Sequence, residues 1–389
     1  MLLGAEISNY DVFDNDLCGC LMDDYPQGIK LKRLTSLIGR NQTGKTSFID
    51  ALNFVKDTVK RNVEEASINH GRPGFAKLVI DREKIASFKL YFKLPSIDEE
   101  HRYLLVQYEL DVKASANGGP YITAERLYML KKTNDGKENQ YNKQTIMDLC
   151  NGRGFVTNRN GSTEAVQLEE LNVTALGIWG KITNYPIICS TYREMMRWFF
   201  CRFSTENKNT YYVEGNAPGG HKHLNSDGSN VGNVLEYLES LDKTQYSSLI
   251  DDIRSKIPNM KKGGKLPDNV ESSPDRLFLY LLLLRDPEPN STIFIETPDK
   301  DLYHDMVDVL SNEMRQFSLR RGYSQILFST HNPYILETMS PNEIWLFKRE
   351  FEKDEGDVTI SCVGSNDIVN ALSQEGVGMG AIWYGGYLD

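Results

Sequence analysis

Alternating and continuous hydrophobic runs divide the chain into strand-like and helix-like segments. The pattern predicts a strand at residues 2–10 and a second strand at residues 31–38, which ends directly at a glycine-rich turn. Residues 47–61 then repeat apolar side chains at helical spacing. The order strand, turn and helix is the one that a phosphate-binding loop requires.

The next part of the chain predicts an antiparallel β lobe. Period-two alternation between polar turns marks its strands, at residues 78–80, 87–94, 102–112 and 122–130. Residues 132–165 are polar and rich in Asn, Gly and Lys, which favours loops. Residues 166–202 are expected to be largely helical, and the polar tract 204–230 to be a long functional or mobile loop.

The second half of the chain alternates helices with short, continuously apolar strands. Helices are expected at residues 231–240, 249–256, 276–284 and 303–317, and strands at residues 292–295 and 325–329. Such strands indicate a parallel sheet that is covered on both faces. The predicted fold class is therefore α/β, with a mostly parallel core sheet, an antiparallel β lobe and a helical insertion.

Composition and charge narrow the class of protein. The 389 residues are 40% hydrophobic and 25% charged, which excludes disorder or a fibrous repeat for most of the chain. A formal net charge of −10 argues against a dedicated DNA coat, and the short basic patch of Lys261, Lys262 and Lys265 is better explained as a solvated loop. Six scattered cysteines, no leader-like start and no apolar run of membrane-spanning length predict a cytoplasmic protein without a membrane partner.

The glycine-rich turn matches the pattern G-x-x-x-x-G-K-[ST] in full. Glycines let the backbone curl so that N–H groups face a phosphate, the lysine reaches the β- and γ-phosphates, and the threonine hydroxyl ligates Mg²⁺. The cofactors implied are ATP and Mg²⁺. The residues expected to bind the nucleotide are Gly39, Arg40, Asn41, Gln42, Thr43, Gly44, Lys45, Thr46 and Ser47.

Two later strand ends, at residues 293–299 and 326–333, complete a family resemblance. Together with the phosphate loop they resemble an ATPase head of the ABC type, in the branch that includes SMC, RecF and the OLD-like ATPases of phage-defence operons. Residues 227–238, 286–289 and 376–388 are similar to stretches of OLD-like ATPases. The resemblance covers most of residues 1–60 and 225–389 and is thin over the middle lobe.

The resemblance implies roles for particular residues. Glu296 would take part in catalysis and in the Mg²⁺ shell together with Thr46, and His331 would be the catalytic switch histidine. Ser272 falls in the signature loop, whose serine contacts the γ-phosphate of the opposite subunit in such heads. Heads of this type dimerise around ATP, so a homodimer or higher homo-oligomer is implied.

Two departures from the family pattern predict impaired hydrolysis. The family's Asp-Glu-Pro is replaced by Glu296-Thr297-Pro298, which leaves a threonine where a glutamate positions the attacking water. A shifted register would make Glu296 the catalytic glutamate but would put Ile295 at the metal position. Pro274 also removes an N–H donor from the signature loop. Whether the chain is an active enzyme therefore stays open.

This interpretation divides the chain into four parts. Residues 1–62 form the first half of the head, 63–275 the inserted β lobe and helical region, 276–350 the second half, and 351–389 a C-terminal extension. The extension is too short for the Toprim nuclease domain that OLD proteins carry. The partners expected are a second copy and a separate effector protein, a nuclease or toxin, with DNA or a phage protein as further candidates.

Three functions compete. The favoured one is an ATP-binding, weakly hydrolysing or non-hydrolysing subunit of a bacterial anti-phage defence complex, acting as a scaffold or sensor for the effector. The alternative is a DNA-repair or chromosome-maintenance ATPase of the RecF/SMC type, although the sequence has no long heptad run. An ordinary motor or transporter subunit is disfavoured by Thr297 and Pro274.

Two further groups of side chains allow two interpretations each. Tyr10 and Phe13 are equally suited to stacking on adenine and to a plain strand end. The second group is an arginine-rich stretch interleaved with aromatic residues, with Arg193, Arg197 and Arg202. These arginines could bind a phosphate backbone or a carboxylate of a partner. The favoured interpretation is a helix with an apolar face bordered by arginines.

Overall fold

The computed structural model divides the chain into two compact units. It describes residues 1–18, 30–95, 103–115, 117, 119–132, 141–203, 220–258, 260, 272–320, 324–349 and 358–388. The first unit comprises Met1–Lys32, Leu37–Trp198 and Asn342–Ser365. The second comprises Arg33–Ser36, Phe199–Pro341 and Asn366–Asp389, so the chain passes between the units inside one strand.

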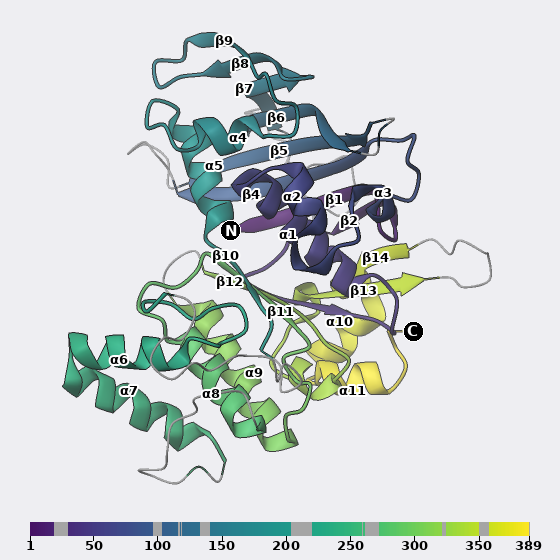
Figure 1. Ribbon diagram of the computed structural model, residues 1–389. Coiled ribbons are helices and arrows are strands. Elements are labelled where there is room, and N and C mark those ends of the chain that lie inside the picture. The colour runs from purple at the N-terminus through teal and green to yellow at the C-terminus, as the bar shows by residue number, and fades with distance from the viewer. Residues whose placement is uncertain are drawn as a thin grey trace. The chain divides into compact units, whose positions relative to one another are not determined.

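An antiparallel sheet of eight strands dominates the first unit (Figure 1). Its strand order is β2-β1-β4-β5-β6-β7-β8-β9. The strands are β1 (Leu2–Tyr10), β2 (Phe13–Cys18), β4 (Ala86–Pro95), β5 (Tyr103–Ala114), β6 (Pro120–Lys132), β7 (Tyr141–Cys150), β8 (Arg153–Thr157) and β9 (Thr163–Gln167).

The sheet confirms four expected strands and corrects other predictions. The strands predicted at 2–10, 87–94, 102–112 and 122–130 are β1, β4, β5 and β6. The loop predicted over residues 132–165 is wrong, because β7 to β9 lie there with mostly exposed or half-buried side chains that give no hydrophobic alternation. The strand predicted at 78–80 is also wrong, since a helical turn ends at Leu78.

Helices lie against one face of this sheet (Figure 1). They are α1 (Lys45–Lys60), α2 (Val63–Ile68), α3 (Phe75–Leu78), α4 (Ala175–Trp179) and α5 (Pro186–Met196), with a 3₁₀ turn, η1 (Asn69–Gly71). The Asn62 side chain accepts a hydrogen bond from the Glu65 N–H and so caps α2. The region 166–202 is less helical than expected, since only α4 and α5 form there and β10 (Trp198–Cys201) follows.

Aromatic side chains fill the core between α1 and the sheet. The Tyr10 ring lies 5.3 Å from Phe54 and 5.2 Å from Phe88, centroid to centroid, and Phe13 packs against Phe48. Tyr10 and Phe13 are fully buried. Of the two interpretations of this pair, the structure supports the strand-end one, because buried rings cannot stack on a nucleotide base.

A hairpin near the end of the chain also belongs to the first unit. It consists of β13 (Ile344–Arg349) and β14 (Val358–Cys362), which pair antiparallel, and it is flanked by the 3₁₀ turns η3 (Pro341–Glu343) and η4 (Val363–Ser365). Phe347 of β13 packs against Phe48 of α1 at 5.8 Å between ring centroids. The hairpin therefore contributes to the packing of the helix that follows the glycine-rich turn.

The second unit has the α/β character that the sequence predicts. Its strands follow the order β10-β11-β12-β3, and β11 (Thr292–Glu296) pairs parallel with β12 (Gln325–Ser329). The first of its elements in the chain is β3 (Leu34–Ile38). Its helices are α6 (Val231–Leu241), α7 (Lys243–Lys256), α8 (Ser273–Leu284), α9 (His304–Leu319), α10 (Asp367–Gln374) and α11 (Met379–Tyr384), with a 3₁₀ turn, η2 (Pro333–Leu336).

The fold class is thus α/β, but the largest sheet is antiparallel. The expected mostly parallel core is correct only in part, since β11 and β12 form a parallel pair whereas the eight strands of the first unit are antiparallel. The inserted β lobe pairs with the N-terminal strand β1 and so extends a single large sheet.

None of the helices in the described ranges has the length and hydrophobicity needed to span a bilayer. The basic patch at 261–265 and most of the tract 204–230 lie outside the described residues.

Candidate nucleotide-binding site

The loop between β3 and α1 has a backbone that requires glycine at two positions. Gly39 has φ 141°, and a Cβ there would lie 2.2 Å from the Phe347 carbonyl oxygen. Gly44 has φ 98° and ends the loop at the start of α1, where a Cβ would lie 2.9 Å from Val12 Cγ2. Any other residue would clash or be strained at either position. The loop is therefore held in a tight curl at the N-terminus of a 16-residue helix, where N–H groups without intrahelical partners attract anions.

Lys45 lies inside this curl and is almost fully buried. Its ammonium donates hydrogen bonds to the Gly39 and Arg40 carbonyl oxygens at 2.8 and 2.6 Å and to Thr43 Oγ1 at 3.3 Å. Burial lowers the pKa of Lys45 to about 8. A bound polyphosphate would accept hydrogen bonds from the same ammonium and would supply the negative charge that it lacks here. The loop residues therefore fit a nucleotide phosphate.

The low pKa of Lys45 makes ATP affinity dependent on pH. Phosphate needs the charged ammonium, so above pH 8 the site must take up a proton before it binds well. We expect the affinity for ATP to be steady from pH 6.5 to 7.5 and to fall by up to about tenfold for each pH unit above 8. Calorimetric titrations across this range, in buffers of different ionisation enthalpy, measure both the affinity and the proton uptake. A constant affinity to pH 9 would contradict the placement of Lys45 on the phosphates.

The remaining loop residues lie around the opening of the curl. Arg40, Asn41, Gln42 and Thr46 are exposed, whereas Thr43 is buried and donates to the Arg40 carbonyl oxygen at 2.9 Å. Thr46 and Ser47 open the first turn of α1. In the described ranges no cluster of three or more His, Cys, Asp and Glu side chains could hold a metal ion. One threonine hydroxyl and the phosphates of the nucleotide suit Mg²⁺, which is bound by few protein ligands in such sites.

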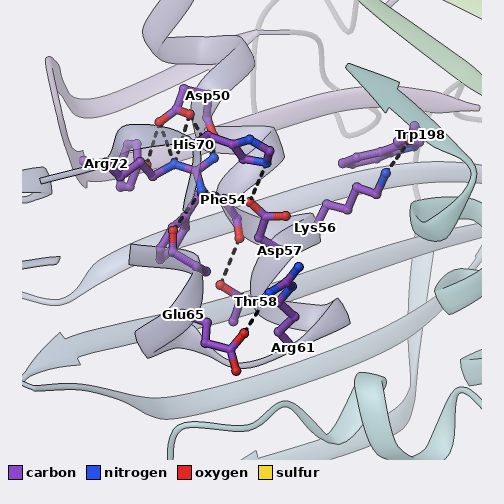
Figure 2. Close-up of polar contacts among 12 residues, drawn as sticks. Asp50, Phe54, Lys56, Asp57, Thr58, Arg61, Glu65, His70, Arg72 and Trp198 are labelled. Atoms are coloured by element: carbon purple, nitrogen blue, oxygen red, sulfur yellow. Dashed lines mark hydrogen bonds and ion pairs between the residues drawn. The ribbon is translucent and has the colours of Figure 1, made fainter. Parts of the chain in front are cut away.

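Buried ion pairs fix α1 behind the loop (Figure 2). The Arg72 guanidinium donates from Nε to both Asp50 carboxylate oxygens at 3.0 Å, and from one terminal nitrogen to Asp57 Oδ2 at 2.9 Å and to the Ala66 carbonyl oxygen at 2.8 Å. His70 Nε2 lies 3.3 Å from Asp57 Oδ2. Burial by itself would raise the pKa of Asp57, but hydrogen bonds from His70 and Arg72 outweigh it and hold that pKa below the usual value. Asp50 and Asp57 lie seven positions apart on one face of α1, so Arg72 clamps the helix.

In the second unit, the structure brings Glu296 and His331 to one sheet edge. Glu296 is the last residue of β11 and lies opposite Ser329, the last residue of the parallel strand β12. His331 follows two positions later and is exposed. Carboxyl ends of parallel strands are a common location for ligand sites in α/β folds.

Thr297, next to Glu296, is held in a strained conformation. Its φ is 42°, a left-handed value that is a genuine outlier for a β-branched residue. Its N–H donates to the Ser329 carbonyl oxygen at 3.0 Å, and its carbonyl oxygen accepts from Arg276 at 3.1 Å. Ile295 is buried within the strand, so the shifted register would offer an apolar side chain, without any ligand atom, at the metal position.

Sequence reasoning missed a second carboxylate at this edge, that of Asp299. Its Oδ1 accepts a hydrogen bond from Thr330 Oγ1 at 2.7 Å, which links the turns that follow β11 and β12. Burial raises the pKa of Asp299, against the opposing effect of the Thr330 hydrogen bond. The available signal was its position directly after Pro298, three residues from Glu296.

The helix that follows the proposed signature loop is tied to the same turn. Ser272 is exposed and caps α8, with its hydroxyl 2.6 Å from an Asp275 carboxylate oxygen. Arg276, one turn along α8, is buried and donates to the carbonyl oxygens of Thr297 and Lys300. Arg276 therefore links the N-terminal part of α8 to the turn after β11.

The candidate residues thus fall into two groups, one in each unit. The phosphate loop, residues 39–47, lies in the first unit, and Ser272, Glu296 and His331 lie in the second. Their joint action on one nucleotide stays a prediction.

Comparison with protein families gives a match to the part of the chain that holds the second group. Residues 234–337, about a quarter of the chain, match the family model described as "AAA domain, putative AbiEii toxin, Type IV TA system". The matched stretch runs through α8, β11, α9 and β12. Over this stretch the chain is similar to an AAA domain. No curated protein matches the sequence.

Solved structures similar to this chain include three heads of SMC proteins. An SMC head bound to the C-winged helix domain of ScpA is 9% identical with a TM-score of 0.48, and the match covers 94% of this chain and 98% of that one. The SMC head domain from Thermotoga maritima is 13% identical with a TM-score of 0.40, over 93% and 98% of the two chains. The SMC head with an extended coiled coil, bound to the C-terminal domain of ScpA from Pyrococcus furiosus, is 8% identical with a TM-score of 0.48, over 97% and 99%. These values mark a distant likeness.

Proposed function

We propose that this chain is the ATP-binding subunit of a bacterial anti-phage defence complex and that it hydrolyses ATP slowly or not at all. In this role it is a nucleotide-stabilised homo-oligomeric scaffold or sensor, located in the cytoplasm, that controls a separate nuclease or toxin. ATP, brought with Mg²⁺, would be held by residues 39–47, and Thr46 and Glu296 would contribute to the metal shell.

The observation that carries this proposal is the contrast between the two groups of site residues. The phosphate loop has each feature that binding requires, namely the glycine curl, the enclosed lysine and the helix N-terminus. Directly after Glu296, however, stands Thr297, whose side chain cannot act as a carboxylate base. Loss of a group that stabilises or positions the reacting atoms commonly costs about 10²–10³ in turnover and leaves binding nearly intact.

The family match supports a role in defence. The name of the matched family refers to the AbiEii toxin of a type IV toxin–antitoxin system, which is a property of that family. For this chain we infer a place in a comparable two-component system, with the effector on another polypeptide. A homo-oligomer is inferred from the resemblance to ABC-type heads, in which the signature-loop serine contacts the γ-phosphate of the opposite subunit. Ser272, which falls in that loop, is exposed at the start of α8.

Restoring the missing carboxylate tests the proposal. Thr297→Glu is expected to raise steady-state ATP turnover by about tenfold or more, because the glutamate can orient water for attack on the γ-phosphate. Thr297→Gln introduces a side chain as long as glutamate but without its charge. It is the matched control, and its ATP turnover should stay at the wild-type rate. Phosphate release from the purified chain measures turnover, and calorimetry confirms equal ATP binding in all three proteins.

One outcome of the same assay would reject the scaffold. Brisk turnover by the wild type that is lost in Asp299→Asn would assign the water-positioning role to Asp299. An active ATPase cycle would then be the correct description.

A further inference from the structure

The exposed side of α5, in the first unit, borders a surface hollow of about 610 Å³. Residues along α5 and its C-cap, Arg197, line it, together with Arg159 from the turn between β8 and β9. The volume is within the range of about 300–1,000 Å³ that is typical of ligand pockets. We call this feature the α5 arginine pocket.

Positive charge dominates the pocket. Arg159, Arg193 and Arg197 are exposed and line it. The carboxylate that also lines it, Glu194, is buried and is 2.5 Å from the N-terminal ammonium of Met1. Among the described residues, no carboxylate forms an ion pair with Arg159 or Arg193. The guanidinium groups of Arg159 and Arg193 are therefore available to an anion from outside the chain.

Arg193 lies in the last turn of α5, and Arg197 caps the C-terminus of that helix. Arg159 reaches the same pocket from the turn between β8 and β9. A guanidinium presents a planar fork of donors that matches a carboxylate or a phosphate. The pocket is thus suited to an anionic group held by two forks.

The walls of the pocket indicate which class of anion it takes. Pro95, Pro186, Met196 and the Tyr192 ring give it apolar sides next to the arginines. A nucleic-acid backbone offers only sugar and charged phosphate to such walls, whereas a peptide can place carboxylates on the guanidinium groups and apolar side chains against the walls. A long polyanion would also meet the net charge of −10 on the rest of the chain, but a short peptide meets mainly the local arginines.

We propose that the α5 arginine pocket binds an acidic, partly apolar peptide segment of a partner protein, with its carboxylates on Arg159 and Arg193. Complementary charge of this kind sets specificity and association rate more than total affinity. The site is separate from the phosphate loop, so its failure would leave the proposed nucleotide function untouched.

Binding of a model peptide tests the proposal. The probe is a short fluorescein-labelled peptide of alternating glutamate and leucine, titrated with the full chain and followed by fluorescence anisotropy. Arg159→Glu with Arg193→Glu is expected to weaken binding by at least about tenfold, since each charge-assisted hydrogen bond contributes strongly. Lys131→Glu with Arg153→Glu, an equal charge change at exposed positions on β6 and β8, is the matched control and should change binding less than about twofold.

Two further readouts make the test decisive. ATP affinity and the thermal unfolding midpoint should be the same in both double variants as in the wild type, which shows that they are folded. The proposal is overturned if the wild type does not bind the peptide or if both double variants bind equally well. It is also overturned if a DNA duplex of matched charge binds more tightly than the peptide and loses that binding in Arg159→Glu with Arg193→Glu.

Discussion

Replacing Lys45 with alanine is expected to weaken ATP binding by about a hundredfold or more and to abolish nucleotide-dependent assembly. The Lys45 ammonium is enclosed by the loop and makes three hydrogen bonds there, to Gly39, Arg40 and Thr43. On a polyphosphate the same donors would form charge-assisted hydrogen bonds, each contributing about 1.5–3 kcal/mol. The loss of two such bonds corresponds to at least about a hundredfold in affinity, at 1.4 kcal/mol for each factor of ten.

Isothermal titration with ATP measures this effect, and size-exclusion chromatography with and without ATP measures assembly. Lys60→Ala removes an exposed lysine at the other end of α1 and is the matched control, for which we expect unchanged affinity. The unfolding midpoint without nucleotide separates lost binding from lost folding. Equal ATP affinity in Lys45→Ala and the wild type would reject the phosphate-loop assignment.

Replacing Arg72 with methionine is expected to destabilise the first unit by about 3–5 kcal/mol, because breaking a buried ion pair leaves an uncompensated charge. Asp57 has a 7% exposed side chain and would keep only its contact with His70, while Asp50 would lose its fork of hydrogen bonds. Methionine fills a similar volume, so the effect measures charge rather than a cavity. The ion pairs that hold α1, the helix that follows the phosphate loop, would be lost (Figure 2).

The effect should depend on pH in a defined direction. In the wild type the pKa of Asp57 is lowered, so the clamp stabilises the fold above the unfolded pKa and this contribution is lost as the pH falls. In Arg72→Met burial would instead favour the protonated carboxyl, so the variant should gain stability relative to the wild type as the pH falls from 7 towards 4. Urea denaturation and amide exchange of α1 measure both trends.

Arg61→Met serves as the control for Arg72→Met. Arg61 pairs with Glu65 on the surface, where both side chains are about half exposed, and exposed pairs contribute about 0–1 kcal/mol. An equal loss of stability in Arg61→Met and Arg72→Met would contradict the special role of the buried clamp.

Local patterns in the sequence were enough to predict the phosphate loop and the α/β second unit. The loop is recognisable because each of its constraints is local: glycines at two tight turns, a lysine and a hydroxyl at the start of a helix. The strand predicted at 325–329 is β12 with the same bounds, and helices predicted at 276–284 and 303–317 match α8 and α9 closely. Continuous apolar runs mark β12 and α8, whose side chains are buried over residues 325–329 and 276–284. The α9 helix is instead marked by apolar residues at helical spacing.

Other features depend on contacts that are distant in sequence. The strands β7 to β9 were not predicted because most of their side chains are exposed or half-buried and the few buried apolar ones, such as Met147 and Val156, give no clear alternation. Their hydrogen bonds to neighbouring strands form only in the folded sheet. For the same reason the sequence could not show that the β lobe and β1 form one antiparallel sheet. The carboxylate of Asp299 becomes a site candidate only when β11 and β12 pair and bring Thr330 to it.

The sequence by itself determined the chemistry available to this protein: a complete phosphate loop, a threonine next to Glu296 and an acidic balance of charge. These are statements about residue types at fixed spacing, which the chain carries whether folded or not. Only the tertiary structure decided the environments: the enclosed ammonium of Lys45, the buried clamp of Arg72, and the arginine pocket beside α5. Burial and charge proximity set pKa values and ion-pair strengths, and both arise from segments that meet only in the folded chain.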